Sequence, residues 1–419
     1  MSAAALSEAL QQVPSFRDFM EGVASDIVGG RHVLLLTGGQ VGAPQLRAGL
    51  EGALARSQGP LLRSVALAEQ FENEAPSVFL SRVTGLPEEQ LRPASRPMET
   101  GGFQTVYDVL WLEGVEGLSP ARAKAWLEFF RLSTRYAAAS SHAFVMPLRR
   151  MMVPLQDITS DTRLALHWWW GRLSGLELRL MCRLVTRESL LSPESVWREA
   201  VLPHVVDGNV GLAAKLWDVV LEPEATLLDA LRRKAREQGL EPSALREVLR
   251  RLGRPKAERS AGDLPPAAWR PLWEMGAAWH NVEHGPELTV LALAALEDLP
   301  AVRNRLWRGQ SALLMPRLNR VRMEVCRALT EKHGRSWPTR FGAAFMDEEQ
   351  RRRVEEDPLS TEHGPLENIL YRRPDVGGQR FLPLVQLSRQ MRNLLAHDEI
   401  VSFGDFRSLW EMQDGLALG

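Results

Sequence analysis

Apolar residues recur at helical spacing over the first 28 residues, and the pattern then changes to short continuous runs. The helical positions, on either side of Pro14, are Leu6, Leu10, Val13, Phe16, Phe19, Val23 and Ile27. Between about residues 30 and 150, four runs rich in Val, Leu and aromatic residues are separated by stretches long enough for helices: RHVLLLTGG, LLRSVAL, TVYDVLWLEGV and HAFVMPL. Strands that alternate with helices form parallel β/α units. We therefore expect a helical segment at 1–29 and a small α/β domain with a parallel sheet at 30–150.

Beyond residue 150 the pattern predicts helices and no further strands. A broad apolar face predicts one long helix over 162–186, and residues 225–252 predict two short helices joined at Gly239 and Pro242. The Gly, Pro and charge content of 253–266 predicts a linker between a helical middle domain, 151–252, and a helical region, 267–419. Further helices are expected near 267–281, 287–297, 304–333, 346–356, 380–397 and 402–413. The expected fold class is multidomain and mainly α.

Composition narrows the class of protein. The 419 residues are too many for one ordinary core, and 45% hydrophobic with 25% charged residues is typical of a soluble globular protein. A net charge of −1 makes any nucleic-acid contact local. Cys182 and Cys326 lie within apolar helical patterns, which predicts buried thiols in a reducing compartment. No leader and no run near the ~18 apolar residues of a membrane span is visible, so we expect a cytoplasmic prokaryotic protein without membrane contact.

A glycine-containing loop follows the first predicted strand in VLLLTGGQVGAPQLRAGL. Thr37 and Gly42 occupy the places of the first and last glycines of a phosphate-binding loop, but Ala43 and Pro44 stand where Lys and Ser/Thr are needed. Glu113 ends the third strand, where a Walker-B-like acid would lie. The domain resembles a degenerate AAA-type P-loop NTPase. This resemblance implies a structural or partner-binding domain without NTP hydrolysis, and we expect no cofactor and no metal.

Two other motifs have structural explanations that we favour. HNVEH, 280–284, matches an H-x-x-E-H zinc motif if it is helical, but Gly285 and Pro286 indicate a helix end and no third ligand stands out. HWWW, 167–170, offers rings for base stacking. Adjacent helical residues point in different directions, so packing of Trp170 and one neighbour is the simpler explanation.

The segment RQMRNLLAHDE, 389–399, combines an apolar stripe with three polar candidates. On a regular helix, at ~100° per residue, Arg392 lies on one side of the stripe, and Asn393 and His397 lie together on the other. Two arrangements bring Arg392 and His397 to one phosphate. Either the helix ends near Ala396, which the β-branched residues at 400 and 401 and a possible N-cap at Ser402 favour, or two copies of the segment share one cleft.

R-N-x-x-x-H near the end of a helical C-terminal region resembles the R-x4-6-H motif of the HEPN family, over about residues 300–419. The resemblance implies a compact helical domain that dimerises, and in many members a metal-independent ribonuclease. Arg392 would then stabilise the phosphorane-like transition state, His397 would move a proton, and Asn393 would orient the site. Arg372, Arg373, Arg380 and Arg389 would supply local charge for an RNA backbone.

These inferences leave three hypotheses. The leading one is a prokaryotic defence or toxin-type protein whose C-terminal HEPN-like ribonuclease acts on RNA and is restrained by an inactive NTPase-like domain. The second is a non-enzymatic adaptor in a defence or stress complex, bound to a protein partner or to a second copy through its C-terminal helices. The third is a nucleotide-gated switch. RNA cleavage separates the first two, and ATP or GTP binding tests the third.

Overall fold

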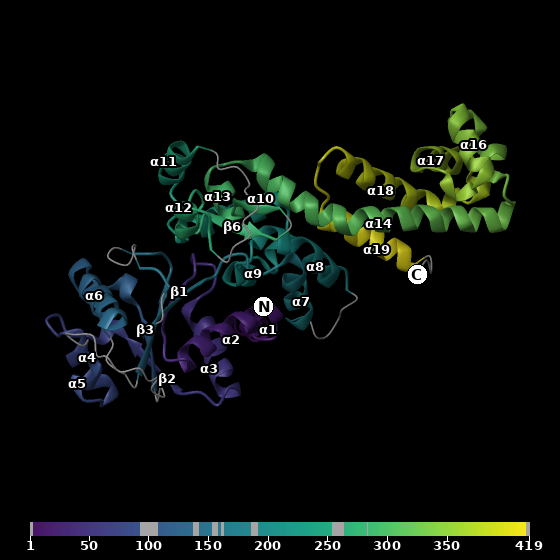
Figure 1. Ribbon diagram of the computed structural model, residues 1–419. Coiled ribbons are helices and arrows are strands. Elements are labelled where there is room, and N and C mark those ends of the chain that lie inside the picture. The colour runs from purple at the N-terminus through teal and green to yellow at the C-terminus, as the bar shows by residue number, and fades with distance from the viewer. Residues whose placement is uncertain are drawn as a thin grey trace. The chain divides into compact units, whose positions relative to one another are not determined.

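The computed structural model describes residues 3–92, 108–136, 142–152, 158–160, 163–185, 192–253, 264–282 and 284–415. Two compact units are formed from interleaved stretches of chain (Figure 1). Unit 1 contains residues 1–185, 206–215 and 233–296, and unit 2 contains 186–205, 216–232 and 297–419. Each unit is described by itself below.

Unit 1 begins with the two predicted helices, α1 (Ala3–Leu10) and α2 (Pro14–Val28). Pro14 occupies the first turn of α2, where its missing N–H would have no partner within the helix. The predicted apolar positions of both helices are buried. The helical pattern of the first 28 residues is therefore confirmed.

A five-stranded parallel sheet forms the core of unit 1. The four predicted strands are β1 (His32–Leu36), β2 (Leu61–Ala66), β3 (Asp108–Glu113) and β4 (His142–Leu148). The fifth, β5 (Leu164–Trp168), pairs with β1 in parallel. The strand order is β2-β3-β4-β1-β5. All five residues of β1 are buried, as expected for a central strand covered on both faces.

Helices cover both faces of this sheet (Figure 1). The chain leaves β1 through α3 (Ala43–Arg56), which packs beside α2, and enters β2 at the sheet edge. From β2 the chain moves back across the sheet one strand at a time. It passes through α4 (Pro76–Thr84) and α5 (Glu88–Leu91) to β3, and through α6 (Pro120–Tyr136) to β4. The connection from β1 to β2 and the connection from β3 to β4 run in opposite directions across the sheet. Because crossovers between parallel strands are right-handed, α3 and α6 lie on opposite faces. The carboxyl ends of β1 and β4 are therefore a switch point, where ligands bind in open α/β sheets.

Two of the sequence predictions for unit 1 are wrong. The long helix expected over 162–186 is β5 followed by the shorter α7 (Gly175–Val185). The helix expected near 267–281 is the short α12 (Arg270–Glu274), followed by a hairpin of β6 (Ala278–Asn281) and β7 (Gly285–Leu288). The helix expected near 287–297 is present as the shorter α13 (Val290–Ala295). Apolar residues on both faces of β5 imitate a helical stripe, and Gly285 with φ 83° makes the hairpin turn.

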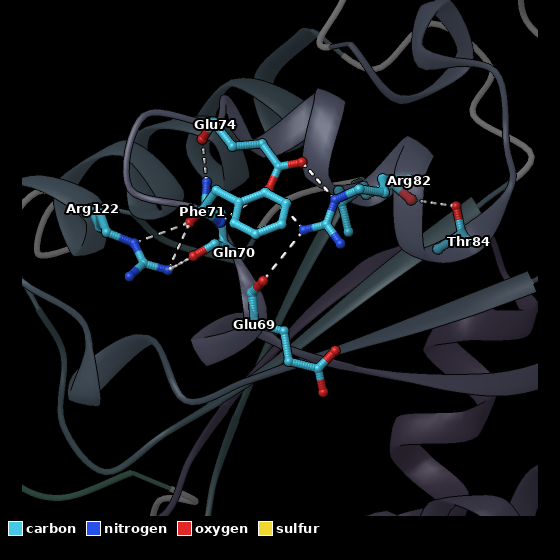
Figure 2. Close-up of polar contacts among 8 residues, drawn as sticks. Glu69, Gln70, Phe71, Glu74, Arg82, Thr84 and Arg122 are labelled. Atoms are coloured by element: carbon cyan, nitrogen blue, oxygen red, sulfur yellow. Dashed lines mark hydrogen bonds and ion pairs between the residues drawn. The ribbon is translucent and has the colours of Figure 1, made fainter.

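The loop after β2 is fixed by hydrogen bonds from two arginines (Figure 2). Arg82 of α4 holds the Glu74 carboxylate at 2.8 and 2.9 Å, and this hydrogen bond lowers the pKa of Glu74. Arg122 of α6 donates to the carbonyl oxygen of Gln70 at 2.8 Å. The Phe71 ring lies over the Arg82 guanidinium at 4.5 Å and is nevertheless 65% exposed. The loop thus presents an aromatic ring on a backbone that is held in place.

The remaining elements are helical. Most of α9 (Val210–Leu216) belongs to unit 1. The pair of helices predicted at 225–252 is confirmed as α10 (Glu224–Glu237) and α11 (Pro242–Leu252). Most of the predicted linker, 254–263, lies outside the described residues. Short 3₁₀ turns occur at η1 (Leu67–Glu69), η2 (Val115–Gly117), η3 (Val219–Leu221), η4 (Ala343–Phe345), η5 (Pro358–Ser360) and η6 (Pro374–Val376).

Unit 2 is an all-helical array around the long α14 (Leu299–His333). Its other helices are α8 (Pro193–Val206), α15 (Trp337–Gly342), α16 (Glu348–Glu356), α17 (His363–Arg372), α18 (Gly378–Ala396) and α19 (Phe403–Gly415). α18 packs against α14, α17 and α19, and a buried stripe of α14 forms the core: Leu314, Leu318, Val321, Val325 and Leu329. The mainly helical class with an N-terminal parallel sheet is confirmed. Within the described residues, no helix combines the length and apolar character required to cross a membrane.

Candidate functional site

The helix that carries the polar triplet ends where the β-branched residues predict. α18 stops at Ala396, and the His397 amide caps it by donating to the carbonyls of Asn393 and Leu394 at 3.1 Å each. Asp398 adopts φ 58°, which turns the chain away from the helix axis. Ser402 Oγ accepts a hydrogen bond from the Asp405 amide at 3.0 Å and so caps the start of α19. The predicted helix end and the predicted N-cap are both confirmed.

Contacts with α14 fix the end of α18. Trp307 Nε1 donates to the Leu395 carbonyl at 2.8 Å, and the Asp398 amide donates to the same oxygen at 3.3 Å, so this carbonyl of the last helical turn accepts two hydrogen bonds. Gln310 exchanges two hydrogen bonds with the backbone of Val401, at 2.8 and 3.0 Å. The apolar stripe of α18 faces inward at Met391 and Leu395, and the polar triplet is left on the accessible side.

The three predicted catalytic residues lie close in the chain but do not form one hydrogen-bonded group. Arg392 and His397 are exposed, and Asn393 is partly buried. Arg392 Nη1 donates to Asn393 Oδ1 at 3.4 Å. Among the described residues, no hydrogen bond or ion pair joins the side chains of Arg392 and His397. The structure therefore brings Arg392 and Asn393 together and leaves His397 at the helix end.

A second histidine, which the sequence analysis did not single out, lies beside Arg392. His363 begins α17, and its Nε2 is 3.0 Å from Ser388 Oγ, one turn before Arg392 on α18. Burial, and then the charges of Arg322, Arg392 and Arg389, lower the pKa of His363 to about 4. No periodic pattern pointed to this residue, because its position depends on how α17 and α18 pack.

The four arginines predicted to contact RNA occupy two places. Arg372 and Arg373 end α17, and Arg380 begins α18; each stacks on a phenylalanine ring at 4.9–5.3 Å. Arg380 is twelve residues from Arg392, or roughly 18 Å along a helix. Arg389 lies next to the triplet, with its Nη1 2.6 Å from Glu367 Oε2. Only Arg389 is therefore positioned to act with Arg392.

The glycine loop of unit 1 lies at the switch point between β1 and β4. The amides of Thr37 and Gly38 donate to the carbonyls of Leu148 and Arg149 at 2.9 Å each. Gly38 and Gly39 have φ of 58° and 74°, a backbone conformation that glycine adopts without strain. This loop has the position of a phosphate-binding loop, but its first amides bond within the protein.

Two side chains cover the loop. Trp273 is fully buried, and a Cβ added to Gly38 would lie 2.4 Å from its Nε1. Arg149 packs against Gly39, and its Nη2 donates to the carbonyls of Met275 at 2.6 Å and Gln238 at 3.4 Å. Burial lowers the pKa of Arg149, and the charge of Glu116 opposes this shift. The cavity beside the loop has a volume of about 10 Å³, room for about one water molecule.

The remaining motifs take structural roles. Glu113 ends β3 as predicted, and its carboxylate accepts the Trp111 Nε1 hydrogen at 3.1 Å. His280 lies in β6 and His284 in the following turn, so these histidines are not one helical turn apart; Glu283 lies outside the described residues. Trp168, Trp169 and Trp170 are all buried and offer no rings for base stacking. No group of three metal-ligating side chains occurs in the described ranges.

The cysteines agree with the sequence analysis. Cys182 and Cys326 are buried thiols that form no disulfide among the described residues, and burial raises the pKa of Cys326 to about 12.

No family model matches the sequence, and no curated protein matches it.

Proposed function

We propose that this chain is a HEPN-like, metal-independent ribonuclease whose catalytic residues lie at the end of α18. The observation that supports the proposal is the helix end itself. Termination at Ala396 leaves Arg392 in contact with Asn393 and His397 at the helix end, all three outside the buried apolar stripe of the same helix. The N-terminal α/β unit then senses or docks a partner, because its covered loop has no room for a nucleotide, which needs a pocket of several hundred Å³.

The chemistry requires no metal. The 2′-oxygen of a ribose attacks the adjacent phosphorus, and the bond to the 5′-oxygen breaks, which leaves a 2′,3′-cyclic phosphate and a 5′-hydroxyl. His397 takes the proton from the 2′-hydroxyl while water protonates the leaving 5′-oxygen, or His397 protonates the leaving oxygen while water takes the proton of the 2′-hydroxyl. Arg392 donates two hydrogen bonds to the phosphoryl oxygens, whose charge grows in the transition state. Asn393, which already contacts Arg392, orients the guanidinium.

Incubation of the purified chain with total RNA in EDTA tests this function. Wild type is expected to cleave, and Arg392→Ala and His397→Ala are expected to be strongly impaired. Arg407→Ala is a matched control, because Arg407 is an exposed arginine on α19 that pairs with Glu411 at 2.9 Å. Absence of cleavage in wild type, or equal cleavage in all variants, would rule out the ribonuclease.

Two copies of the chain provide a way to join Arg392 and His397 in one cleft. If each cleft takes its arginine from one copy and its histidine from the other, a mixture of the two single variants regains activity. Half of the dimers would be mixed and would hold one intact cleft of two, so recovery of about a quarter of wild-type activity is expected. No recovery would indicate a site within one chain.

A non-enzymatic adaptor is the second candidate, and Phe71 favours it. An exposed aromatic ring on a fixed loop, stacked on an arginine, has the composition of a protein-binding hot spot. The adaptor predicts that wild type leaves RNA intact at every enzyme concentration tested. The same RNA experiment therefore separates the two candidates.

A further inference from the structure

A polar seam runs between α17 and α18 beside the triplet. We define the seam by His363 and Glu367 of α17 and by Ser388, Arg389 and Arg392 of α18. Ser388 is fully buried and bonds His363 Nε2 at 3.0 Å. Arg392 follows Ser388 by four residues and so lies on the same face of the helix, one turn further on. Arg392 therefore projects beside the imidazole of His363.

Positive charge exceeds negative charge at the seam. Arg322 of α14 donates to the carbonyl oxygens of Leu359 and Thr361 and to the side-chain oxygen of Asn319, none of which is charged. Within the described part of the chain, the one hydrogen bond of the Arg392 side chain is the 3.4 Å contact with Asn393 Oδ1. The carboxylate of Glu367 forms an ion pair with Arg389 and so balances the charge of that one arginine. Two guanidinium groups near His363 thus remain without a carboxylate in these contacts.

The hydrogen bonds of His363 suit its protonated form. One ring nitrogen faces the Ser388 hydroxyl oxygen, and a second hydrogen bond, to the backbone of Leu318, raises the pKa. An imidazolium has two N–H donors and would find an oxygen acceptor for each. The Ser388 hydroxyl can turn its own hydrogen to the carbonyl one turn earlier in α18. Burial and the nearby arginines keep the ring neutral despite these acceptors.

We propose that the seam binds an RNA phosphodiester, which Arg392 and Arg389 hold by charge-assisted hydrogen bonds and which lies beside His363. The choice of RNA rests on the proposed function, but binding at the seam requires no cleavage. Of the charged groups that face His363, Arg322 comes from α14, Glu367 from α17, and Arg389 and Arg392 from α18. A bound phosphodiester brings one negative charge into this set and offsets the charge of the arginines.

Binding is therefore linked to uptake of a proton by His363. The anion offsets the charges of the arginines but leaves burial, the first cause of the lowered pKa, in place. The pKa of His363 therefore rises towards its ordinary ~6.5 without reaching it, and affinity rises as the pH falls from 6.5 towards 4. Full restoration would give a gain of about 30-fold between pH 8 and pH 5, which is the upper limit for this one group. A phosphodiester stays singly charged throughout this range, so the ligand itself adds no titration.

The test measures binding of a fluorescent 2′-deoxyuridine tetranucleotide at pH 5, 6, 7 and 8 and constant ionic strength. This probe has no 2′-hydroxyl and cannot be cleaved by the proposed reaction. Wild type should bind more tightly at pH 5 than at pH 8, by up to about 30-fold, beyond the general trend shown by His363→Gln. Arg392→Ala and Arg389→Ala should weaken binding at every pH. His284→Ala, a change at an exposed histidine of unit 1, should match wild type.

Three results would overturn the proposal: no binding, a pH dependence unchanged in His363→Gln, or a pH dependence lost in His397→Ala instead. Circular dichroism of each variant excludes unfolding, and Arg389→Ala keeps the test decisive if His363→Gln fails to fold. Seam-dependent binding without RNA cleavage would support the seam and reject the ribonuclease. Cleavage without seam-dependent binding would do the reverse.

Discussion

Substitution of Gly38 by alanine should destabilise unit 1, because Trp273 lies directly against the glycine. Two costs add. A residue with a Cβ pays about 1–2 kcal/mol to adopt a left-handed backbone. The added methyl would also lie 2.4 Å from Trp273 Nε1, and an overpacked core costs about 1–3 kcal/mol. The expected loss in free energy of unfolding is about 2–5 kcal/mol.

Gly85→Ala is the matched control. Gly85 has φ 73°, close to that of Gly38, but a Cβ there meets nothing within 4 Å. It also belongs to unit 1, so both changes are read from the same unfolding transition. Gly85→Ala should therefore cost only the backbone term, and the difference between the two variants measures the contact with Trp273.

Urea denaturation followed by tryptophan fluorescence gives both values. A difference of about 2 kcal/mol should move the midpoint by about 1 M. In the double variant Gly38→Ala with Trp273→Ala, the penalty of the alanine at 38 should fall to that of Gly85→Ala. Equal losses for Gly38→Ala and Gly85→Ala would refute the conclusion that Trp273 covers the loop.

Three further predictions concern single groups. Cys182 and Cys326 should resist a thiol reagent at pH 8 until the protein is unfolded, and fast labelling of the native chain would contradict their burial. Because the pKa of His363 is lowered to about 4, its neutral form stabilises the fold above the unfolded pKa of ~6.5, and this stability is lost as the pH falls towards 4. Urea midpoints at pH 7.5 and 5 should show wild type losing about 2 kcal/mol more than His363→Gln, and equal losses would refute the assignment. Trp307→Phe removes the hydrogen bond to the Leu395 carbonyl and should cost unit 2 about 1 kcal/mol in urea denaturation; an unchanged midpoint would mean that this bond does not hold the end of α18.

The sequence predicted those elements whose pattern is local. β1 to β4 were identifiable because each contains a short run rich in apolar residues between turn residues. The end of α18 was predictable because Ile400 and Val401 disfavour a helix and Ser402 caps the next one. The helical class of unit 2 followed from apolar periodicity.

The sequence did not predict features that depend on distant contacts. β5 is apolar on both faces, so its residues, continued into those of α7, fit a helical stripe as well as a strand. Trp273 is distant from Gly38 in the sequence but packs against it, and no local pattern encodes that contact. His363 likewise acquires its neighbours only when α17 packs on α18. The predicted residues of the candidate site lie on α18 or at its end. His363, which was not predicted, lies on α17 and joins the site through the packing of α17 against α18.

Cleavage of an end-labelled RNA in EDTA, by wild type, Arg392→Ala and Arg407→Ala, shows whether the end of α18 is a ribonuclease site. Loss of one group that stabilises transition-state charge typically costs about 10²–10³ in rate. We expect wild type and Arg407→Ala to cleave at the same rate and Arg392→Ala to be slower by this factor. An Arg392→Ala protein as active as wild type, or a wild type that leaves the RNA intact, would contradict it.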